Sequence, residues 1–270
     1  MPHIARLLTI ASSDSSGGAG IQADLRAFAA AGAHGSSVIV ALTAQNTREV
    51  RSVHAVPAQF VLEQLATVVD DIAVDGVKTG MLYSAEIIEA VAGFLSGLAV
   101  PVVVDPVMVA SSGATLLRAD AVAVMVERLF PLATVVTPNL PEAEALTGGR
   151  GSRRELATAL HELGAPAVIV TGGHGDEPVD HLFDGHRHVE IPVARHAVAA
   201  THGAGCTHSA TLAALLAQGW PLDEAARRAA AVAAAAVQHG LVGLGGGDGA
   251  VDVLDVRSRV LRPPLAAAAR

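Results

Sequence analysis

Residues 101–105 read PVVVD, and residues 134–137 read TVVT. Short runs of β-branched apolar residues are typical of strands that are buried on both faces of a sheet. Segments with the apolar periodicity of helices follow them, at 119–130 and 152–163. Parallel strands need a crossover connection, which is usually a helix. The alternation therefore predicts an α/β fold, with a mostly parallel central sheet and helices on both faces.

The same alternation extends towards both ends of the chain. Further strands are expected at 7–11, 37–42, 75–78 and 167–171. Further helices are expected from the glycines near 17–20 to Ala31, and at 57–70, 84–98, 206–218 and 222–239. Asp184-Gly185 lies between two short apolar runs and predicts a late antiparallel hairpin. No linker interrupts the pattern, so we expect a single domain over 1–262 and a loose tail over 263–270.

Composition narrows the functional classes. The chain has 270 residues, of which 51% are hydrophobic, and a formal net charge of −8. This hydrophobic content argues against a disordered chain, and the negative charge argues against a nucleic-acid partner. One cysteine excludes an intrachain disulfide and fits the reducing cytoplasm. The longest alanine-rich stretch, 225–237, contains two arginines and is too short to span a membrane, so we expect no membrane partner.

Polar and glycine-rich segments follow the predicted strands, at the edge where open α/β sheets bind ligands. The segment THGAGCT, residues 201–207, opens a strongly helical stretch. Free amides at a helix N-terminus stabilise an anion such as a phosphoryl group, and the same field is expected to lower the pKa of Cys206. The alternative, which the motif alone allows equally, is a glycine-rich loop that enters a buried helix with an inert thiol.

Two residues near the first strands are candidate ligand contacts. Asp14 lies in a Ser/Gly-rich segment that lacks the lysine of a nucleotide-binding P-loop, and its carboxylate can accept a hydrogen bond from a ligand. The alternative is a helix-capping cluster. The amide of Gln45 offers a donor and an acceptor side by side, which matches the edge of an aminopyrimidine. The alternative there is a polar turn.

Three residues are candidate ligands of Mg²⁺, which prefers oxygen donors. Asn139 and Glu142 lie three residues apart, just after a predicted strand. Asp105 ends the apolar run PVVVD, where an unpaired buried charge is costly and a metal ion is a suitable partner. The alternative for Asn139 and Glu142 is the first turn of a helix.

Taken together, these segments resemble the hydroxymethylpyrimidine/phosphomethylpyrimidine kinases of thiamine biosynthesis, in the ribokinase-like superfamily. The resemblance runs from about residue 7 to residue 249. The matching segments are LTIASSDSSGGAGIQADL, VIVALTAQNT, KTGML, VVVDPVM, TPNLPEAEALTG, TGGH and THGAGC. The resemblance implies a ribokinase-like three-layer sandwich. It also implies ATP-dependent phosphorylation of 4-amino-5-hydroxymethyl-2-methylpyrimidine, followed by phosphorylation of the monophosphate to the diphosphate.

The resemblance assigns roles to individual residues. The pyrimidine pocket falls on Gln45, Ala19, Met81 and Val107, with Asp14 beside it. The anion hole falls on the segment 202–206, including Gly203, Ala204 and Gly205, and Cys206 takes the position of the catalytic base. The cofactors are ATP and Mg²⁺: the nucleotide contacts fall on Thr171, Gly172 and Asn139, and the metal ligands on Asp105 and Glu142.

Three positions depart from the family pattern. Ser12 replaces a glycine next to the substrate ring, Thr171 replaces a lysine near the nucleotide, and Ala204 removes a hydroxyl from the anion hole. Two alternatives remain at this stage: a pyridoxal kinase, and a non-catalytic pyrimidine-binding module. The expected partners are a small pyrimidine and ATP, and we expect the protein to form a homodimer.

Overall fold

One continuous sheet organises the molecule. The computed structural model describes residues 3–109, 113, 116–173 and 178–259. Nine strands of these residues form a single sheet in the order β3-β2-β1-β4-β5-β6-β7-β8-β9. The pairs from β2 through β1, β4, β5 and β6 to β7 are parallel, whereas β3, β8 and β9 are antiparallel to their neighbours. The expected tail at 263–270 lies outside the described residues.

The elements have the following bounds. The strands are β1 (Arg6–Asp14), β2 (His34–Gln45), β3 (Val50–Ala55), β4 (Gly76–Thr79), β5 (Val102–Val104), β6 (Val135–Val136), β7 (Val168–Val170), β8 (Val179–Phe183) and β9 (His188–Pro192). The α-helices are α1 (Gly20–Ala30), α2 (Ala58–Asp71), α3 (Ala85–Leu95), α4 (Ala119–Val124), α5 (Leu140–Thr147), α6 (Arg153–Glu162), α7 (Ala204–Ala217) and α8 (Leu222–Gln238).

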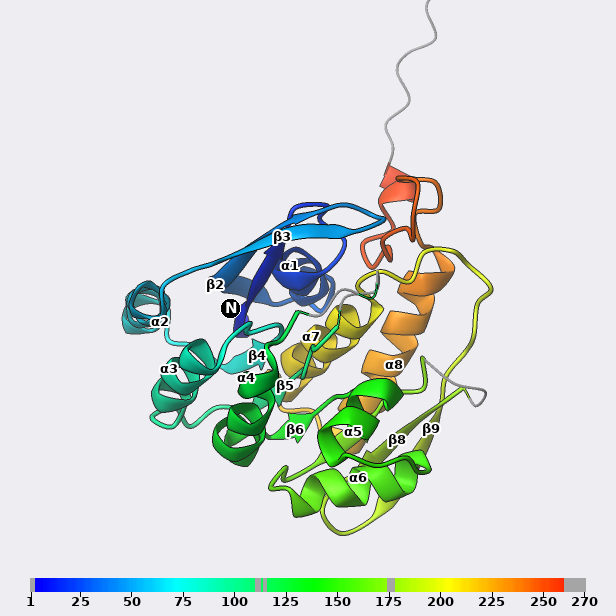
Figure 1. The fold of residues 1–270 in the computed structure, drawn as a ribbon. Coiled ribbons are helices and arrows are strands. Elements are labelled where there is room, and N and C mark those ends of the chain that lie inside the picture. The colour runs from blue at the N-terminus through cyan, green and yellow to red at the C-terminus, as the bar shows by residue number, and fades with distance from the viewer. Residues whose placement is uncertain (1–2, 110–112, 114–115, 174–177, 260–270) are drawn as a thin grey trace, which may run out of the picture.

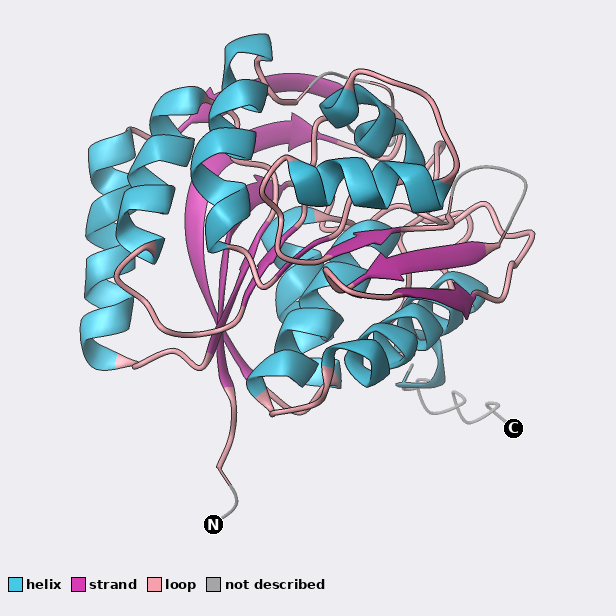
Figure 2. Ribbon diagram, turned by 90° about the horizontal axis from the view of Figure 1, so that it is seen from below, coloured by secondary structure: helices cyan, strands magenta, loops and turns pink. Residues whose placement is uncertain are grey.

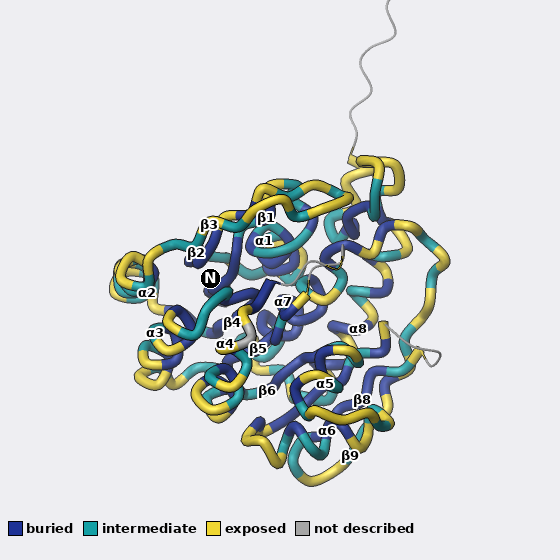
Figure 3. Tube along the Cα trace, viewed as in Figure 1, coloured by how far each residue is buried: buried dark blue, intermediate teal, exposed yellow. Residues whose placement is uncertain are grey.

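Helices cover both faces of the sheet, and each face has its own apolar cluster (Figures 1 and 2). Successive strand residues point to opposite faces. Accordingly, Leu8 belongs to the apolar cluster that contains residues of α2 to α6, whereas its neighbour Leu7 belongs to the cluster that contains residues of α1, α7 and α8. The strands are therefore buried on both sides, as the dark central trace of Figure 3 shows. The predicted α/β fold with helices on both faces is confirmed.

The edges of the sheet differ from the prediction in one respect. The late hairpin is confirmed. In its turn, the Asp184 side chain accepts hydrogen bonds from the backbone amides of His186 and Arg187, and Gly185 has φ +86°. Strand β3, at the opposite edge of the sheet, was not predicted from the sequence. Asn46 nucleates the turn between β2 and β3, because its side-chain oxygen accepts the amides of Arg48 and Glu49.

Two helical segments also differ from the prediction. The helix expected at 119–130 is α-helical only to Val124 and continues as a π-helical turn, Met125–Leu129, and a 3₁₀ turn, Phe130–Leu132. Helix α5 was not predicted as an element. It begins in a capping box between Asn139 and Glu142 and ends at Gly148, which has φ +69°. Among the helices that the structure describes, none is long and apolar enough to cross a membrane.

Candidate active site

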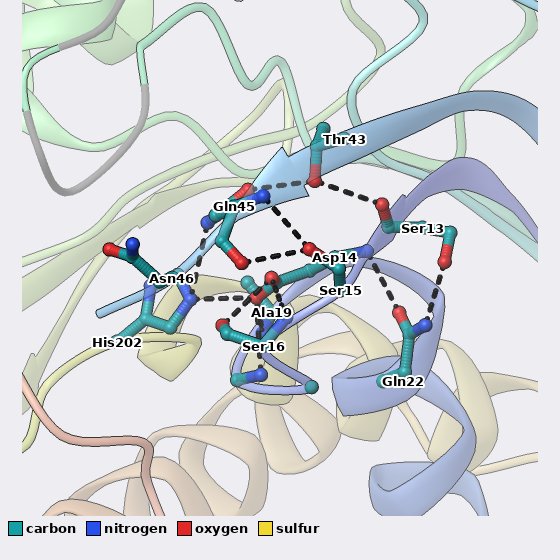
Figure 4. Close-up of polar contacts among 12 residues, drawn as sticks. Ser13, Asp14, Ser15, Ser16, Ala19, Gln22, Thr43, Gln45, Asn46 and His202 are labelled. Atoms are coloured by element: carbon teal, nitrogen blue, oxygen red, sulfur yellow. Dashed lines mark hydrogen bonds and ion pairs between the residues drawn. The ribbon is translucent and has the colours of Figure 1, made fainter. Parts of the chain in front are cut away.

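The loop after β1 is organised around the Asp14 carboxylate (Figure 4). Asp14 Oδ1 accepts the amide and the hydroxyl of Ser16, and Oδ2 accepts the amides of Gly18 and Ala19. Oδ2 also lies 2.8 Å from His202 Nε2. Burial would raise the pKa of Asp14, but these hydrogen bonds outweigh it and lower the pKa to about 2. Both oxygens are thus engaged by the protein, so Asp14 holds the loop in place.

The segment before α7 packs tightly against this loop. Gly203 has φ +87° and is the N-cap of α7. A Cβ at Gly203 would lie 2.0 Å from the carbonyl oxygen of Gly18, and a Cβ at Gly18 would lie 2.1 Å from Cδ2 of His202. Only glycine fits at either position without a shift of the backbone or of the imidazole. The two glycine-rich segments, far apart in the sequence, therefore form one rigid junction.

Gln45 lies beside this junction at the end of β2. Its side chain lies 3.1 Å from Thr43 Oγ1 and 3.4 Å from His202 Nε2 (Figure 4). Gln45 and His202 also line a cavity of about 320 Å³, together with Asn46, Thr47, Arg48, Gly247 and Asp248. Gln45, which the sequence predicts to bind the edge of an aminopyrimidine, therefore lies at the wall of a cavity.

The other expected pocket residues come from neighbouring strand ends. Ala19 is the N-cap of α1, and its amide is donated to Asp14. Met81 follows β4 and is buried, whereas Val107 follows β5 and is half-buried; both belong to the same apolar cluster. They lie at the carboxyl ends of adjacent parallel strands, where the fold places ligands.

The first turn of α7 offers free amides. The amide of Ala204 is donated to the carbonyl oxygen of Thr201, so it is not available to an anion. Within the described part of the chain, the amides of Gly205 and Cys206 have no acceptor. The helix dipole adds partial positive charge at the same place. Among the described residues the amide of Gly203 has no acceptor either, so within the predicted segment 203–206 the protein takes up the amide of Ala204 alone.

The expected pKa of Cys206 is wrong in direction. Burial of the thiol raises its pKa to about 12, and the carboxylates of Asp24 and Asp105 act in the same direction. The Lys78 ammonium and a hydrogen bond from the Gly20 amide oppose this rise but do not overcome it. The helix N-terminus alone was a poor guide, because burial, which depends on the tertiary fold, has the largest effect on this thiol. The structure therefore raises the pKa of Cys206, whereas the sequence predicted that it would be lowered.

Beneath this site lies a buried ion cluster that the sequence analysis missed. Lys78 Nζ lies 2.8 and 3.0 Å from the two carboxylate oxygens of Asp24, and 3.8 Å from Asp105 Oδ2. Thr9 Oγ1 donates to Asp24 over 2.6 Å, and Ser209 Oγ donates to Asp105 over 2.9 Å. The side chains of Lys78 and Asp24 are fully buried. A lysine within the buried strand GVKT was the available signal, since a buried charge needs a partner.

Asp105 and Glu142 form a second pair of buried carboxylates. Burial and the charge of Asp105 raise the pKa of Glu142 to about 8. Glu142 also completes the capping box with Asn139, so the structural alternative for these two residues is confirmed. Among the described residues, no group of three or more metal-binding side chains exists. Two repelling carboxylates fit Mg²⁺, which takes one or two protein carboxylates and fills its other positions with water and phosphate.

The segment after β7, where the sequence places nucleotide contacts, has its backbone amides engaged within the protein. Thr171 lies beside Asn139, and its amide is donated to the carbonyl oxygen of Pro138. The amide of Gly172 donates a hydrogen bond to Asp180 Oδ1, with 2.6 Å between nitrogen and oxygen. A Cβ at Gly172 would lie 2.4 Å from the carbonyl oxygen of Val179. The Gly172 amide is therefore committed to the protein, and this glycine serves close packing.

The phosphomethylpyrimidine kinase family matches this chain over residues 14–252. The chain belongs to this family. A thiamine biosynthesis bifunctional protein of Geobacter sulfurreducens is 51% identical over 264 residues, which cover 94% of this chain and 54% of the relative. This chain therefore spans about half the length of that protein. A hydroxymethylpyrimidine/phosphomethylpyrimidine kinase of Rhizobium meliloti is 51% identical over 85% of this chain and 89% of the relative.

Solved structures show the same fold. An ADP complex of Bacillus subtilis pyridoxal kinase superposes with a TM-score of 0.86 and 36% identity, over 94% of this chain and 99% of that one. The fold is thus ribokinase-like, and the chain is a kinase. The non-catalytic pyrimidine-binding module considered above finds no support in this family.

Proposed function

We propose that this kinase transfers the terminal phosphoryl group of ATP to 4-amino-5-hydroxymethyl-2-methylpyrimidine and then phosphorylates the monophosphate to the diphosphate. The names of its relatives support both steps. The observation that carries the proposal is the segment 202–206. Its first residue, His202, contacts Gln45, the proposed ring-binding side chain. Its last residues form the first turn of α7, where the amides of Gly205 and Cys206 have no acceptor among the described residues. A ring and a phosphoryl group would therefore be held by one rigid segment.

The residues divide the work as follows. The amides of Gly205 and Cys206 would bind oxygens of the transferring phosphoryl group, where charge stabilisation counts most. Asp105 and Glu142 would hold Mg²⁺, which neutralises phosphate charge when it is bound. Cys206 is the proposed acceptor of the hydroxymethyl proton. Because burial raises the pKa of this thiol to about 12, we assign the larger part of catalysis to positioning and the smaller part to this base.

Several finer assignments belong to the same proposal. We place the nucleotide beside Thr171 and Asn139, which adjoin each other at the strand ends. We regard residues 1–262 as one kinase domain that works in the cytoplasm, as the single cysteine suggests. We also propose a homodimer, and exposed apolar side chains such as Leu42 on β2 are surface that association could cover. Light scattering of the purified protein tests the oligomeric state.

Pyridoxal is the second candidate substrate. The observation that favours it is the close structural match to a pyridoxal kinase. Comparing kcat/KM for the pyrimidine alcohol and for pyridoxal decides between them, and we expect the pyrimidine to be preferred.

A Gln45→Leu variant tests the site itself. Leucine keeps the volume but leaves the polar edge of the ring unpaired, which costs on the order of 1–3 kcal/mol. The KM for the pyrimidine should rise, while the KM for ATP should stay near its original value. Equal changes in both constants would show that Gln45 supports the fold and does not bind the ring.

A further inference from the structure

The hydroxyl of Ser209 joins helix α7 to the Asp105 carboxylate. Ser209 lies on α7 three residues after Cys206, it is fully buried, and its Oγ is 2.9 Å from Asp105 Oδ2. The same Oγ is 3.0 Å from the carbonyl oxygen of Gly205 and 3.2 Å from that of Cys206. A hydroxyl has one hydrogen, so these three oxygens compete for it.

The Asp105 carboxylate is the acceptor that needs this hydrogen. The two carbonyl oxygens lie within α7 and already accept the backbone amides four residues further along the helix. Asp105 Oδ2 accepts no other hydrogen bond from the described residues, and Lys78 Nζ, at 3.8 Å, is too far away to donate one. A charged acceptor also forms a stronger hydrogen bond than a neutral one. Ser209 therefore donates to Asp105.

The two oxygens of Asp105 consequently have different partners. Oδ2 has the Ser209 hydroxyl and, further away, the Lys78 ammonium, whereas no described residue donates a hydrogen bond to Oδ1. The Asp105 side chain is only 7% exposed, and an oxygen without a donor is costly in such a place. Burial and the charge of Asp105 raise the pKa of Glu142, so the two carboxylates interact unfavourably. A cation at Oδ1 would relieve both costs.

Helix α7 thus contributes to two parts of the proposed phosphoryl site. Its first turn contains the amides of Gly205 and Cys206, which have no acceptor among the described residues. Its next turn holds the Asp105 carboxylate through Ser209. Because both contacts come from one helix, the position of the carboxylate relative to the transferring phosphoryl group is fixed by a rigid element.

We propose that Ser209 is a positioning residue that holds the Asp105 carboxylate for Mg²⁺, so that Oδ2 is kept by the protein and Oδ1 is offered to the metal ion. Without the hydroxyl, the carboxylate is free to turn towards the Lys78 ammonium, which lies 3.8 Å from Oδ2. The metal ion would then compete with a buried cation for the same carboxylate. The inference rests on the proposed function, since it takes Asp105 as a ligand of Mg²⁺.

The test measures the affinity of the protein for Mn²⁺, which takes the same oxygen ligands as Mg²⁺ and can be followed by electron paramagnetic resonance. Mn²⁺ is titrated into protein saturated with ADP, with ADP alone as the blank. Ser209→Ala removes the donor and should weaken Mn²⁺ binding about tenfold or more. The KM for the pyrimidine should stay near its original value, because the variant leaves the ring-binding residues untouched.

Thr211→Val is the matched control. Thr211 is also buried on α7, but its hydroxyl has no hydrogen-bond partner among the described residues. Valine has nearly the same shape, so this variant should bind Mn²⁺ as the original protein does. If Ser209→Ala does not fold, Ser209→Cys replaces it, since a thiol has a similar shape and is a weak donor. That variant should also bind Mn²⁺ more weakly.

A second comparison shows whether Ser209 acts through Asp105. Asp105→Ala should weaken Mn²⁺ binding, and adding Ser209→Ala should weaken it no further. Additive losses would overturn the inference, and so would unchanged or tighter binding in a Ser209→Ala chain that circular dichroism shows to be folded. If the original protein binds no Mn²⁺ beyond the blank, the proposed metal site has failed as well. If it binds Mn²⁺ and Ser209→Ala binds it equally well, only the role of Ser209 has failed.

Discussion

Replacing Lys78 with methionine should destabilise the protein strongly, because Lys78 is the counter-ion of a fully buried carboxylate. Both side chains of the Lys78–Asp24 pair have no exposed surface, and the nitrogen lies within 3.0 Å of both oxygens. Methionine has a similar volume, so the loss is one of charge pairing. Breaking a buried ion pair from one side costs about 3–5 kcal/mol, which corresponds to a drop in Tm of roughly 6–20 °C for a chain of this size.

The loss should also depend on pH. Burial already raises the pKa of Asp24, and the Lys78 ammonium opposes this rise. Without Lys78, the pKa of Asp24 in the folded chain moves further above its unfolded value. Below the unfolded pKa, Asp24 is protonated in both states and the penalty is small. The penalty then grows as the pH rises towards the folded-state pKa.

Urea denaturation over a pH series measures both effects. Arg51→Met is the matched control, because the Arg51–Glu49 pair is exposed and should contribute less than about 1 kcal/mol. The double variant Lys78→Met/Asp24→Leu should recover most of the stability, since replacing both partners leaves no unpaired charge. A Lys78→Met protein within 1 kcal/mol of the original at neutral pH would refute the reasoning.

Three further predictions concern the active site. Cys206→Ala should lower kcat by about 10²-fold while both substrates still bind. In the original protein, Cys206 should react with iodoacetamide about a hundredfold more slowly than free cysteine at pH 8, and alkylation at the rate of free cysteine would contradict its raised pKa. In metal-free protein, the free energy of unfolding should fall as pH rises from about 4.5 to about 8, because Glu142 holds its proton more tightly when folded, and Glu142→Gln should flatten this slope in urea titrations. Thr171→Lys should lower the KM for ATP and increase its dependence on salt, whereas an unchanged KM would show that this position does not meet the nucleotide.

The layered architecture could be predicted because it depends on local patterns. The apolar runs of β5, β6 and β7 predict strands buried on both faces, and the hairpin at Asp184-Gly185 depends on local turn chemistry. Strand β3 was missed because its sequence, VRSVHA, alternates weakly and lies at an exposed edge. Its best signal was Asn46, which makes the turn that pairs β3 with β2.

The sequence could predict which residues belong to the candidate site, but not the pKa values and hydrogen bonds that the fold gives them. The glycines of segment 202–206 and the amide of Gln45 carry their chemistry in the residue type. The raised pKa of Cys206 depends mainly on its burial in the folded chain. The hydrogen bond of the Gly172 amide depends on Asp180, eight residues further along the chain. Likewise, the contact between Asp14 and His202 joins residues separated by 188 positions. Such contacts follow from the tertiary fold, and periodicity does not reveal them.

The most direct test of the account is to follow the products by phosphorus NMR when the purified protein is mixed with ATP, Mg²⁺ and 4-amino-5-hydroxymethyl-2-methylpyrimidine. The account predicts a pyrimidine monophosphate that gives way to a diphosphate, with one ADP released in each of the two steps. Hydrolysis of ATP without a phosphorylated pyrimidine would contradict it.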